Sequence, residues 1–270
     1  MELSPKDDFH LYVNHDWLLN TDIREGKSTE SSFSEAHDKI NEKALALLND
    51  DTLTGHDAEL CQSLYNAILD WDARDEAGIE PIKATVQDIQ GIGSLDELSD
   101  FICDPERSMF VSTLTNCGNS ISLDDSDRYV TTIVTDGFLL EDAAEYKSRT
   151  DIGDNAYRGN LYLSKAILTR LDYSESEIET MFDDVITFEG KIAEKSLTSA
   201  DMLSIDYIDM INNVYSPADI KGLAKSYPLF GFLKSLQYED ADRYMVFQPN
   251  AIKRIDELYT EDNLETIKNY

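Results

Sequence analysis

The side chains that could bind a catalytic metal are few and unsuitably spaced. A zinc-peptidase helix needs two histidines four residues apart with a glutamate beside the first, so that both imidazoles reach one ion and the carboxylate activates its water. The four histidines of this chain form no such His-Glu-x-x-His segment; they are His10, His15, His37 and His56. His10 and His15 are five residues apart and fall on diverging faces of a helix. We therefore expect this chain to contain no catalytic residue and no metal ligand, and to bind no cofactor by itself.

Other patterns that carry chemistry are missing as well. Asp70 and Asp72 are followed by Arg74, and Asp125 and Asp127 by neither a third ligand nor a glycine, so neither pair resembles a calcium loop. The sequence has no Gly-x-Ser-x-Gly elbow, no phosphate-binding lysine loop and no Gly-x-Gly-x-x-Gly segment after a predicted strand. It thus contains no self-sufficient active site.

Composition excludes several classes of partner. The 270 residues include 54 acidic and 23 basic side chains, a formal net charge of −31. Such a surface repels phosphates and anionic lipids, so we expect binding to neither nucleic acid nor membrane. A solvated acidic surface that aids solubility also accounts for this charge. The N-terminus lacks a basic-then-apolar signal and no apolar run could span a bilayer, which favours a cytoplasmic location.

The spacing of the three cysteines does not indicate a disulfide framework. Cys61, Cys103 and Cys117 are odd in number and widely spaced, unlike a disulfide scaffold or a Cys-x-x-Cys metal site. We expect buried free thiols.

The element around which the chain is organised lies near its start. Phe9, Val13 and Trp17 recur every four residues and Tyr12 fills the adjoining position, which predicts a helix with one aromatic face. Asp7 or Asp8 can cap it, because a short side-chain oxygen accepts a free amide hydrogen of the first turn. We expect this helix to be buried as a plug in the core of a helical domain.

Helical periods and caps recur along the chain. Ser31 or Ser32 starts a helix, Ser94 with Glu97 and Ser174 with Glu177 are predicted capping boxes, and Ser216 is a cap followed by Pro217 at the first helical position. Further helices are predicted over residues 31–49, 57–71, 79–91, 94–103, 155–171 and 174–197, and after Ser216, Pro249 and Thr260. Short strands are predicted over 109–114, 120–124, 129–135 and 243–248, where β-branched and aromatic residues gather. The fold class is mainly α, a multi-helical domain with a small antiparallel β-hairpin or short sheet around 109–135. With no linker or repeat, residues 1–270 are expected to form one domain.

The order of these segments resembles a known family. Asp7-Asp8-Phe9, Tyr12, Trp17-Leu18 and Ile23 match the opening signature of the neprilysin-like M13 zinc metallopeptidases, including their bacterial oligopeptidase and endothelin-converting-enzyme-like branch. Similar segments follow along the chain: Phe33, Leu64-Tyr65, 78–82, Phe188-Glu189-Gly190-Lys191-Ile192-Ala193 and Tyr244 to Pro249. The usual Ile-Pro of the family reads Ile23-Arg24 here.

The resemblance implies the N-terminal cap domain of a peptidase. In the family a C-terminal lobe carries the His-Glu-x-x-His helix and its zinc, while a mainly helical lobe encloses the chamber and admits small peptides. This chain is similar to the cap alone, so the resemblance implies zinc in a catalytic lobe outside this chain. That lobe and peptide substrates would be its partners, in a bacterial cytoplasmic enzyme.

The resemblance also indicates two residues that could face substrate. Some mammalian members place two substrate-contacting arginines shortly after the opening signature, and by spacing from Ile23 and Phe33 their positions are Thr29 and His37 here. Neither can grip a carboxylate as arginine does, so Thr29 and His37 are retained only as candidates that face the chamber.

Two functions of different classes remain open. The first is the substrate-enclosing domain of an M13-like zinc endopeptidase, inactive alone. The second is a stand-alone acidic helical module, derived from such a peptidase, that binds a protein partner. An apolar stripe of Leu264, Ile267 and Tyr270, expected to be exposed, motivates the second.

Overall fold

The chain divides into two compact units in a computed structural model that describes residues 4–27, 29–108 and 110–270. Unit 1 is Met1–Gly78 and unit 2 is Ile79–Tyr270. Both are described separately below. The fold class is confirmed: helices dominate and a small sheet is added. The single domain expected over residues 1–270 stays a prediction.

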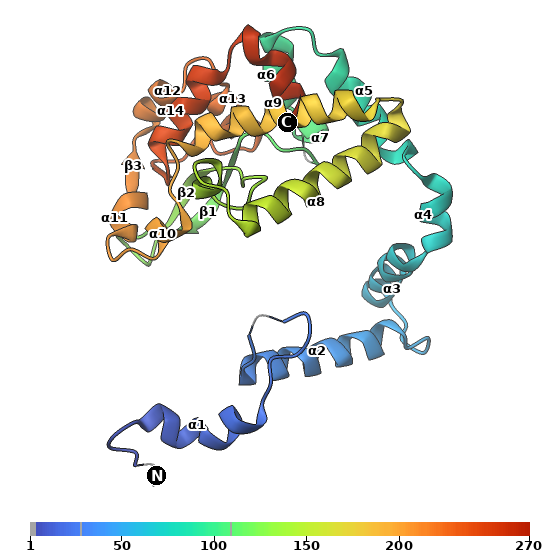
Figure 1. Ribbon diagram of the computed structural model, residues 1–270, viewed down its shortest axis with the longest axis vertical. Coiled ribbons are helices and arrows are strands. Elements are labelled where there is room, and N and C mark those ends of the chain that lie inside the picture. The colour runs from blue at the N-terminus through green and yellow to red at the C-terminus, as the bar shows by residue number, and fades with distance from the viewer. Residues whose placement is uncertain (1–3, 28, 109) are drawn as a thin grey trace. The chain divides into compact units, whose positions relative to one another are not determined.

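Unit 1 consists of helices joined by short connections (Figure 1). They are α1 (Phe9–Asn20), α2 (Ser32–Leu48), α3 (His56–Leu69) and α4 (Trp71–Ala77). The predicted caps of the first two are confirmed. Asp8 Oδ1 accepts from Leu11 N (2.8 Å), and Ser31 Oγ accepts from Ser34 N (3.1 Å). These bonds satisfy amide hydrogens that have no partner inside the helix.

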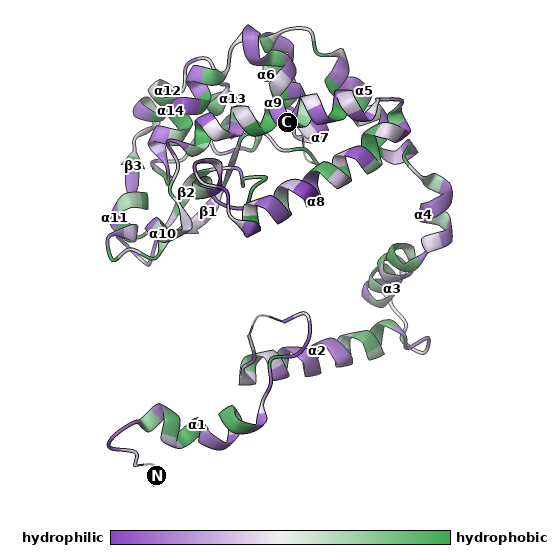
Figure 2. Cartoon of the chain, in the orientation of Figure 1, coloured by the Kyte–Doolittle hydropathy of each residue, from purple (hydrophilic) through white to green (hydrophobic). Residues whose placement is uncertain are grey.

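The expected burial of α1 is wrong within this unit. None of the described residues 4–27 and 29–78 is buried, and Phe9 keeps 68% of its surface exposed. Apolar residues also recur along α2 and α3, as the hydropathy colours show (Figure 2), and several of their side chains are exposed. Trp17 donates to Glu35 on α2 (3.2 Å), a polar contact that leaves the neighbouring rings uncovered. A unit of this size made of separated helices cannot supply enough surface to bury those faces.

Unit 2 is built around α9, which contacts α8, α14, α15 and a 3₁₀ turn over Ala143–Tyr146 (Figure 1). Its helices are α5 (Glu80–Gly91), α6 (Leu95–Ile102), α7 (Pro105–Ser108), α8 (Asp151–Leu168), α9 (Glu175–Ala193), α10 (Ser199–Met202), α11 (Tyr207–Ile211), α12 (Pro217–Leu223), α13 (Leu229–Ser235), α14 (Pro249–Leu258) and α15 (Leu264–Asn269). Further 3₁₀ turns span Thr169–Leu171 and Glu261–Asn263.

A four-stranded mixed sheet completes unit 2, in the order β1-β2-β4-β3. The strands are β1 (Thr115–Ile121), β2 (Tyr129–Thr135), β3 (Asn213–Tyr215) and β4 (Tyr244–Val246). β1 and β2 form an antiparallel hairpin, β4 runs parallel to β2, and β3 pairs antiparallel with β4. The strands expected over 129–135 and 243–248 are confirmed.

The strand expected over 109–114 is wrong. Residue 109 lies outside the described residues, and 110–114 form no strand. Leu114 has a positive φ of 66°, so the backbone turns there and cannot run extended into β1. Of the strand expected over 120–124, only residues 120 and 121 are strand: they end β1, which begins at Thr115, and 122–124 form no strand.

The predicted caps in unit 2 show one instructive difference. Ser174 and Glu177 form the full capping box that begins α9. Ser94 caps α6 by accepting from Glu97 N, but Glu97 accepts from Gly93 N (2.7 Å) and not from Ser94. The Glu97 side chain therefore still accepts from a backbone amide at the start of the helix, but that amide belongs to Gly93, one residue before Ser94.

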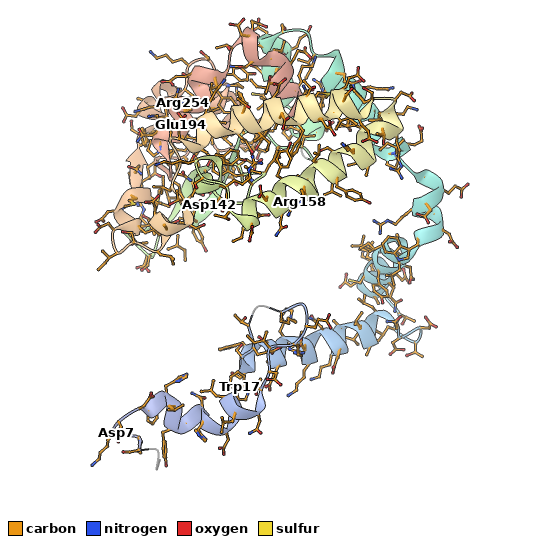
Figure 3. The ribbon with its side chains drawn as sticks, viewed as in Figure 1. Asp7, Trp17, Asp142, Arg158, Glu194 and Arg254 are labelled. Atoms are coloured by element: carbon orange, nitrogen blue, oxygen red, sulfur yellow. The ribbon has the colours of Figure 1, made fainter. Side chains whose placement is uncertain are left out.

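The core of unit 2 joins α9 to the sheet and to the last helices. Its fully buried side chains include Ile133 on β2, Ile178 on α9, Val246 on β4 and Ile252 on α14. Arg254 on α14 lies beside Glu194 at the end of α9, with Nη2 4.0 Å from Oε2 (Figure 3).

The expectation of an exposed stripe at the end of the chain is also wrong. Leu264 and Ile267 are buried in this core, and Tyr270 packs against it. The stripe already has its partner surface inside unit 2.

Shortening a core side chain tests this packing. Ile252→Ala should lower the free energy of unfolding by about 3 kcal/mol, because Ile252 is fully buried and the lost methyl groups leave a cavity. Urea unfolding followed by circular dichroism measures the change. Ile208→Ala on α11 is the control, since Ile208 is exposed, and should stay within about 0.5 kcal/mol of the parent. Equal losses in both variants would contradict the core described above.

Candidate functional site

The two candidate substrate-facing residues are both exposed and lie close in sequence to one ion cluster. Thr29 belongs to the connection between α1 and α2, and His37 lies on α2 with its Nδ1 3.1 Å from Nδ2 of Asn41. Their sequence neighbours Glu30 and Asp38 are the acids of the cluster.

Arg24 is the centre of that cluster. Its Nη2 lies 2.9 Å from Oε2 of Glu30 and 2.6 Å from Oδ2 of Asp38, and its Nε donates to Oε1 of Glu30. Hydrogen bonds from Arg24 lower the pKa of both carboxyls, so they stay ionised at neutral pH. Lys27 adds a longer contact of 3.6 Å to Asp38. The cluster ties the connection that carries Thr29 to the helix that carries His37.

Sequence reasoning missed the role of Arg24. The residue drew attention only as a departure from the Ile-Pro of the resembled family. An arginine in an acidic segment indicates an ion pair. Its partners Glu30 and Asp38 are six and fourteen positions away, and no helix or strand periodicity relates the three residues.

The helices of unit 1 and the connections between them carry many exposed apolar side chains. Phe33, at 85%, is among the most exposed. The exposed set is Phe9, Tyr12, Val13, Leu18, Leu19, Ile23, Phe33, Ile40, Leu45, Leu47, Leu53, Leu60, Leu64, Ile68, Leu69 and Trp71. Large apolar surface of this kind marks a region that contacts another protein surface.

Among the described residues of unit 2, Glu145 and Glu189 have buried side chains, and Glu189 is the more completely buried. Glu189 on α9 is 1% exposed, and its two oxygens each lie 3.2 Å from Leu139 N, while the hydroxyl of Tyr146 donates to Oε2. Burial raises the pKa of Glu189 to about 7, despite the donors that favour its charged form. Burial and the nearby Glu189 carboxylate also raise the pKa of the Tyr146 hydroxyl. This carboxyl holds the segment after β2 against α9.

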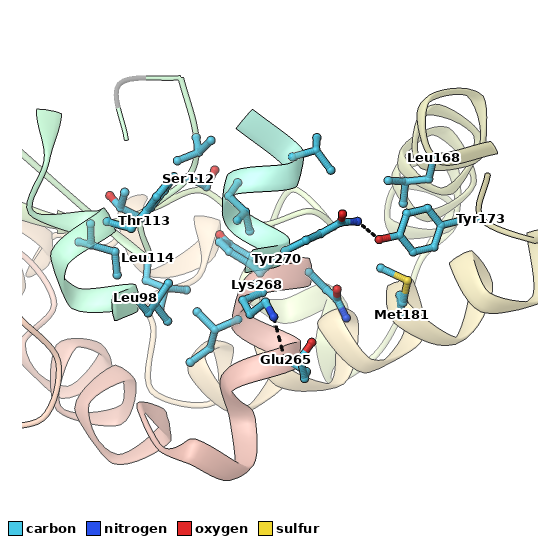
Figure 4. Close-up of a pocket in the computed structure, with 18 residues that line it drawn as sticks. Leu98, Ser112, Thr113, Leu114, Leu168, Tyr173, Met181, Glu265, Lys268 and Tyr270 are labelled. Atoms are coloured by element: carbon cyan, nitrogen blue, oxygen red, sulfur yellow. Dashed lines mark hydrogen bonds and ion pairs between the residues drawn. The ribbon is translucent and has the colours of Figure 1, made fainter. Parts of the chain in front are cut away.

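A cavity of about 680 Å³ lies between α5, α6, α9 and the end of the chain (Figure 4). Its walls are mainly apolar, with Leu98 and Met181 among them. At its rim Gln90 donates to the hydroxyl of Tyr173, and Lys268 Nζ lies 2.8 Å from Oε1 of Glu265. It contains no paired carboxylates, histidine or cysteine that could carry out a reaction.

The described residues contain no group of three or more His, Cys, Asp or Glu side chains placed to hold a metal ion. None of the helices among them is long and apolar enough to cross a bilayer. The cysteines are free thiols, but the expectation that they are buried is wrong: Cys61 is exposed, and Cys103 and Cys117 are only partly buried.

Comparison with known proteins shows matches along almost the whole chain. The model of a family described as peptidase family M13 matches residues 5–270. A neutral endopeptidase of Lactobacillus helveticus is 23% identical over 284 residues, covering 100% of this chain and 42% of that protein. Neprilysin-3 of Drosophila melanogaster is 23% identical over 294 residues, covering 99% and 36%. The chain therefore spans less than half the length of these relatives.

Solved structures share the fold. The zinc metalloprotease Zmp1 of Mycobacterium tuberculosis aligns with a TM-score of 0.75 at 19% identity, over 99% of this chain and 41% of that one. PepO of Lactobacillus rhamnosus HN001 aligns with a TM-score of 0.76 at 19% identity, over 99% and 42%.

The buried Glu189 predicts a pH dependence of stability. The carboxyl holds its proton up to about pH 7 when folded but only to about 4.5 when unfolded, so its contribution is present below pH 4.5 and is lost as the pH rises to 7. Glu189→Gln stays neutral at every pH. Relative to this variant, the free energy of unfolding of the parent should fall by about 3 kcal/mol as the pH rises from 4.5 to 7. Urea unfolding at several pH values measures the difference. Ile208→Ala, an exposed change that involves no titratable group, is the control and should give a difference that does not vary with pH. A constant difference for Glu189→Gln would contradict the shifted pKa.

Proposed function

The chain belongs to peptidase family M13, and from that premise we propose that it is the N-terminal, substrate-enclosing domain of a zinc metalloendopeptidase that hydrolyses small peptides. The observation that carries the proposal is the match of the family model to residues 5–270 of a chain without a His-Glu-x-x-His segment. Recognition and enclosure would lie in this chain, and bond cleavage in a catalytic lobe of the same peptidase.

The side chains of this chain do not fit a zinc site. Its four histidines are too scattered to share an ion, and no acid cluster among the described residues completes a ligand set. The zinc of the family would therefore be bound by the catalytic lobe, and no step of hydrolysis is assigned to residues of this chain.

The catalytic lobe is the partner that unit 1 would bind. The helices of unit 1 bury none of their described residues, and their apolar side chains need a surface that excludes water. Thr29 and His37 would then face the chamber that the two parts enclose, with Arg24 holding their segments. The net charge of −31 favours neutral or basic peptides and disfavours nucleic acid and membrane surfaces. We place the enzyme in the cytoplasm.

A stand-alone binding module derived from the peptidase is the alternative. The exposed stripe that first suggested this alternative is not present, because Leu264 and Ile267 are buried within unit 2. The exposed side chains of unit 1 now support it equally. Reconstitution with a catalytic lobe separates the two functions.

The purified chain should hydrolyse no peptide, with or without added zinc. Adding the catalytic lobe encoded with it should produce zinc-dependent hydrolysis, and backbone amides of α1–α3 should become protected from hydrogen exchange, because their apolar faces become covered. Amides in β2 and α14 are the internal control and should be protected in both states, since they already lie in a core. Hydrolysis without the lobe, or a lobe that neither binds nor acts with this chain, would overturn the proposal.

Within the reconstituted enzyme, His37→Ala should raise KM for a peptide substrate several-fold and leave kcat nearly unchanged, because a chamber-facing side chain contributes to binding and not to bond cleavage. Steady-state kinetics on one peptide measures both constants. His56→Ala is the matched control, since His56 is also exposed but lies at the start of α3. Equal kinetics for the two variants would remove His37 from the site.

A further inference from the structure

The hairpin of unit 2 has an outer edge that pairs with no other strand in the part of the chain that the structure describes. β1 stands at one end of the sheet order β1-β2-β4-β3, so only one of its sides is paired. Its register with β2 is continuous over seven residue pairs, from Thr115 opposite Thr135 to Ile121 opposite Tyr129. A regular antiparallel strand directs every second pair of N–H and C=O groups away from its partner.

The hydrogen bonds that flank the ladder identify the outward groups. Asp136 N donates to Leu114 O (3.0 Å) at one end, and Ser122 N donates to Arg128 O (2.9 Å) at the other. Leu114 and Ser122 therefore direct their backbone groups toward β2. Because this direction alternates along a strand, the backbone N–H and C=O groups of all even-numbered residues of β1 face β2. The amide and carbonyl groups of residues 115, 117, 119 and 121 therefore face outward.

Only part of this outer edge is satisfied by the chain itself. Thr113 Oγ1 donates to Thr115 O (2.9 Å), and Cys117 N donates to Oδ1 of Asn116 (2.8 Å). Ser120 Oγ also donates to Ile121 O, at 3.5 Å. The other outward groups, which are Thr115 N, Cys117 O, both backbone groups of Asn119 and Ile121 N, have no hydrogen-bond partner among the described residues. The side chains of Asn119 and Ile121 are exposed, so this part of the edge is open to solvent.

The usual protections against strand addition are missing from β1. The strand contains no proline and no lysine, and its uninterrupted register leaves no bulge. A free and regular edge of this length can receive a further strand, with main-chain hydrogen bonds giving affinity.

The charges around the edge select a cationic partner. Asp124, Asp125 and Asp127 follow β1 in the hairpin turn, and Asp136 lies at the opposite end of the ladder. Arg128, the basic residue in the turn, is paired with Asp242 (2.8 Å). A peptide with positive charge at both ends would meet acidic side chains at both ends of the strand.

We propose that the outer edge of β1 binds an extended cationic peptide segment as an added strand. Peptide amides donate to the carbonyls of Cys117 and Asn119, and the amides of Asn119 and Ile121 donate to peptide carbonyls. The proposal concerns unit 2 alone and needs no catalytic lobe, so its failure would leave the proposed peptidase function untouched.

The test uses the whole chain and a seven-residue peptide of alternating threonine and valine with a lysine at each end, carrying a neutral dye. Fluorescence anisotropy should show saturable binding, and hydrogen exchange should slow at residues 117–121. The same peptide with every amide N-methylated keeps its charge but cannot donate, and should bind about tenfold more weakly or less. Equal binding of both peptides, no binding of the first, or protection confined to unit 1 would overturn the proposal.

A pair of variants tests the edge from the side of the protein. Asn119→Pro removes an outward N–H and keeps the amides that bond to β2, so binding should weaken about tenfold. Asn116→Ala is the matched control: it frees the amide of Cys117, so binding should stay equal or tighten. Circular dichroism checks that both variants fold. If Asn119→Pro does not fold, the N-methylated peptide decides, and weaker binding by Asn116→Ala than by the parent would count against strand addition.

Discussion

Burial of the apolar face of α9 is the constraint on which unit 2 depends. Ile178, Phe182, Val185, Phe188 and Ile192 are all buried, and the helix is in contact with α8, α14 and α15. The sheet reaches the same core through Ile133 and Val246. The loop after β2 and the end of the chain both pack on α9, so the position of this helix determines where they lie. Glu189 is carried into the interior by the same helix and is tolerated because Leu139 and Tyr146 donate to it.

Much of this unit could be predicted from local chemistry. Ser174 with Glu177, and Ser216 before Pro217, mark helix starts that the structure confirms, because caps act within one turn. The limits of β1 could not be predicted, since the same β-branched residues precede and follow the turn at Leu114. Periodicity also cannot tell which surface covers an apolar face. For that reason Leu264 and Ile267 looked free and are buried, whereas Phe9 and Val13 looked buried and are exposed.

The candidate site was predictable only in outline. Thr29 and His37 follow from family resemblance, and both are exposed. The Arg24 cluster brings together residues from a connection and a helix, a non-local arrangement that no spacing rule describes. The pKa of Glu189 likewise depends on how completely packing removes water from it.

Unit 2 has a dense core, whereas no described residue of unit 1 is buried, and this contrast has a consequence for how the two units respond to proteases. A segment with few buried contacts can open locally without disturbing a core elsewhere in the chain, so its opening costs little free energy. Proteolysis follows the population of such open forms. Limited digestion of this chain therefore cuts the connections and helices of unit 1 before the strands and helices of unit 2.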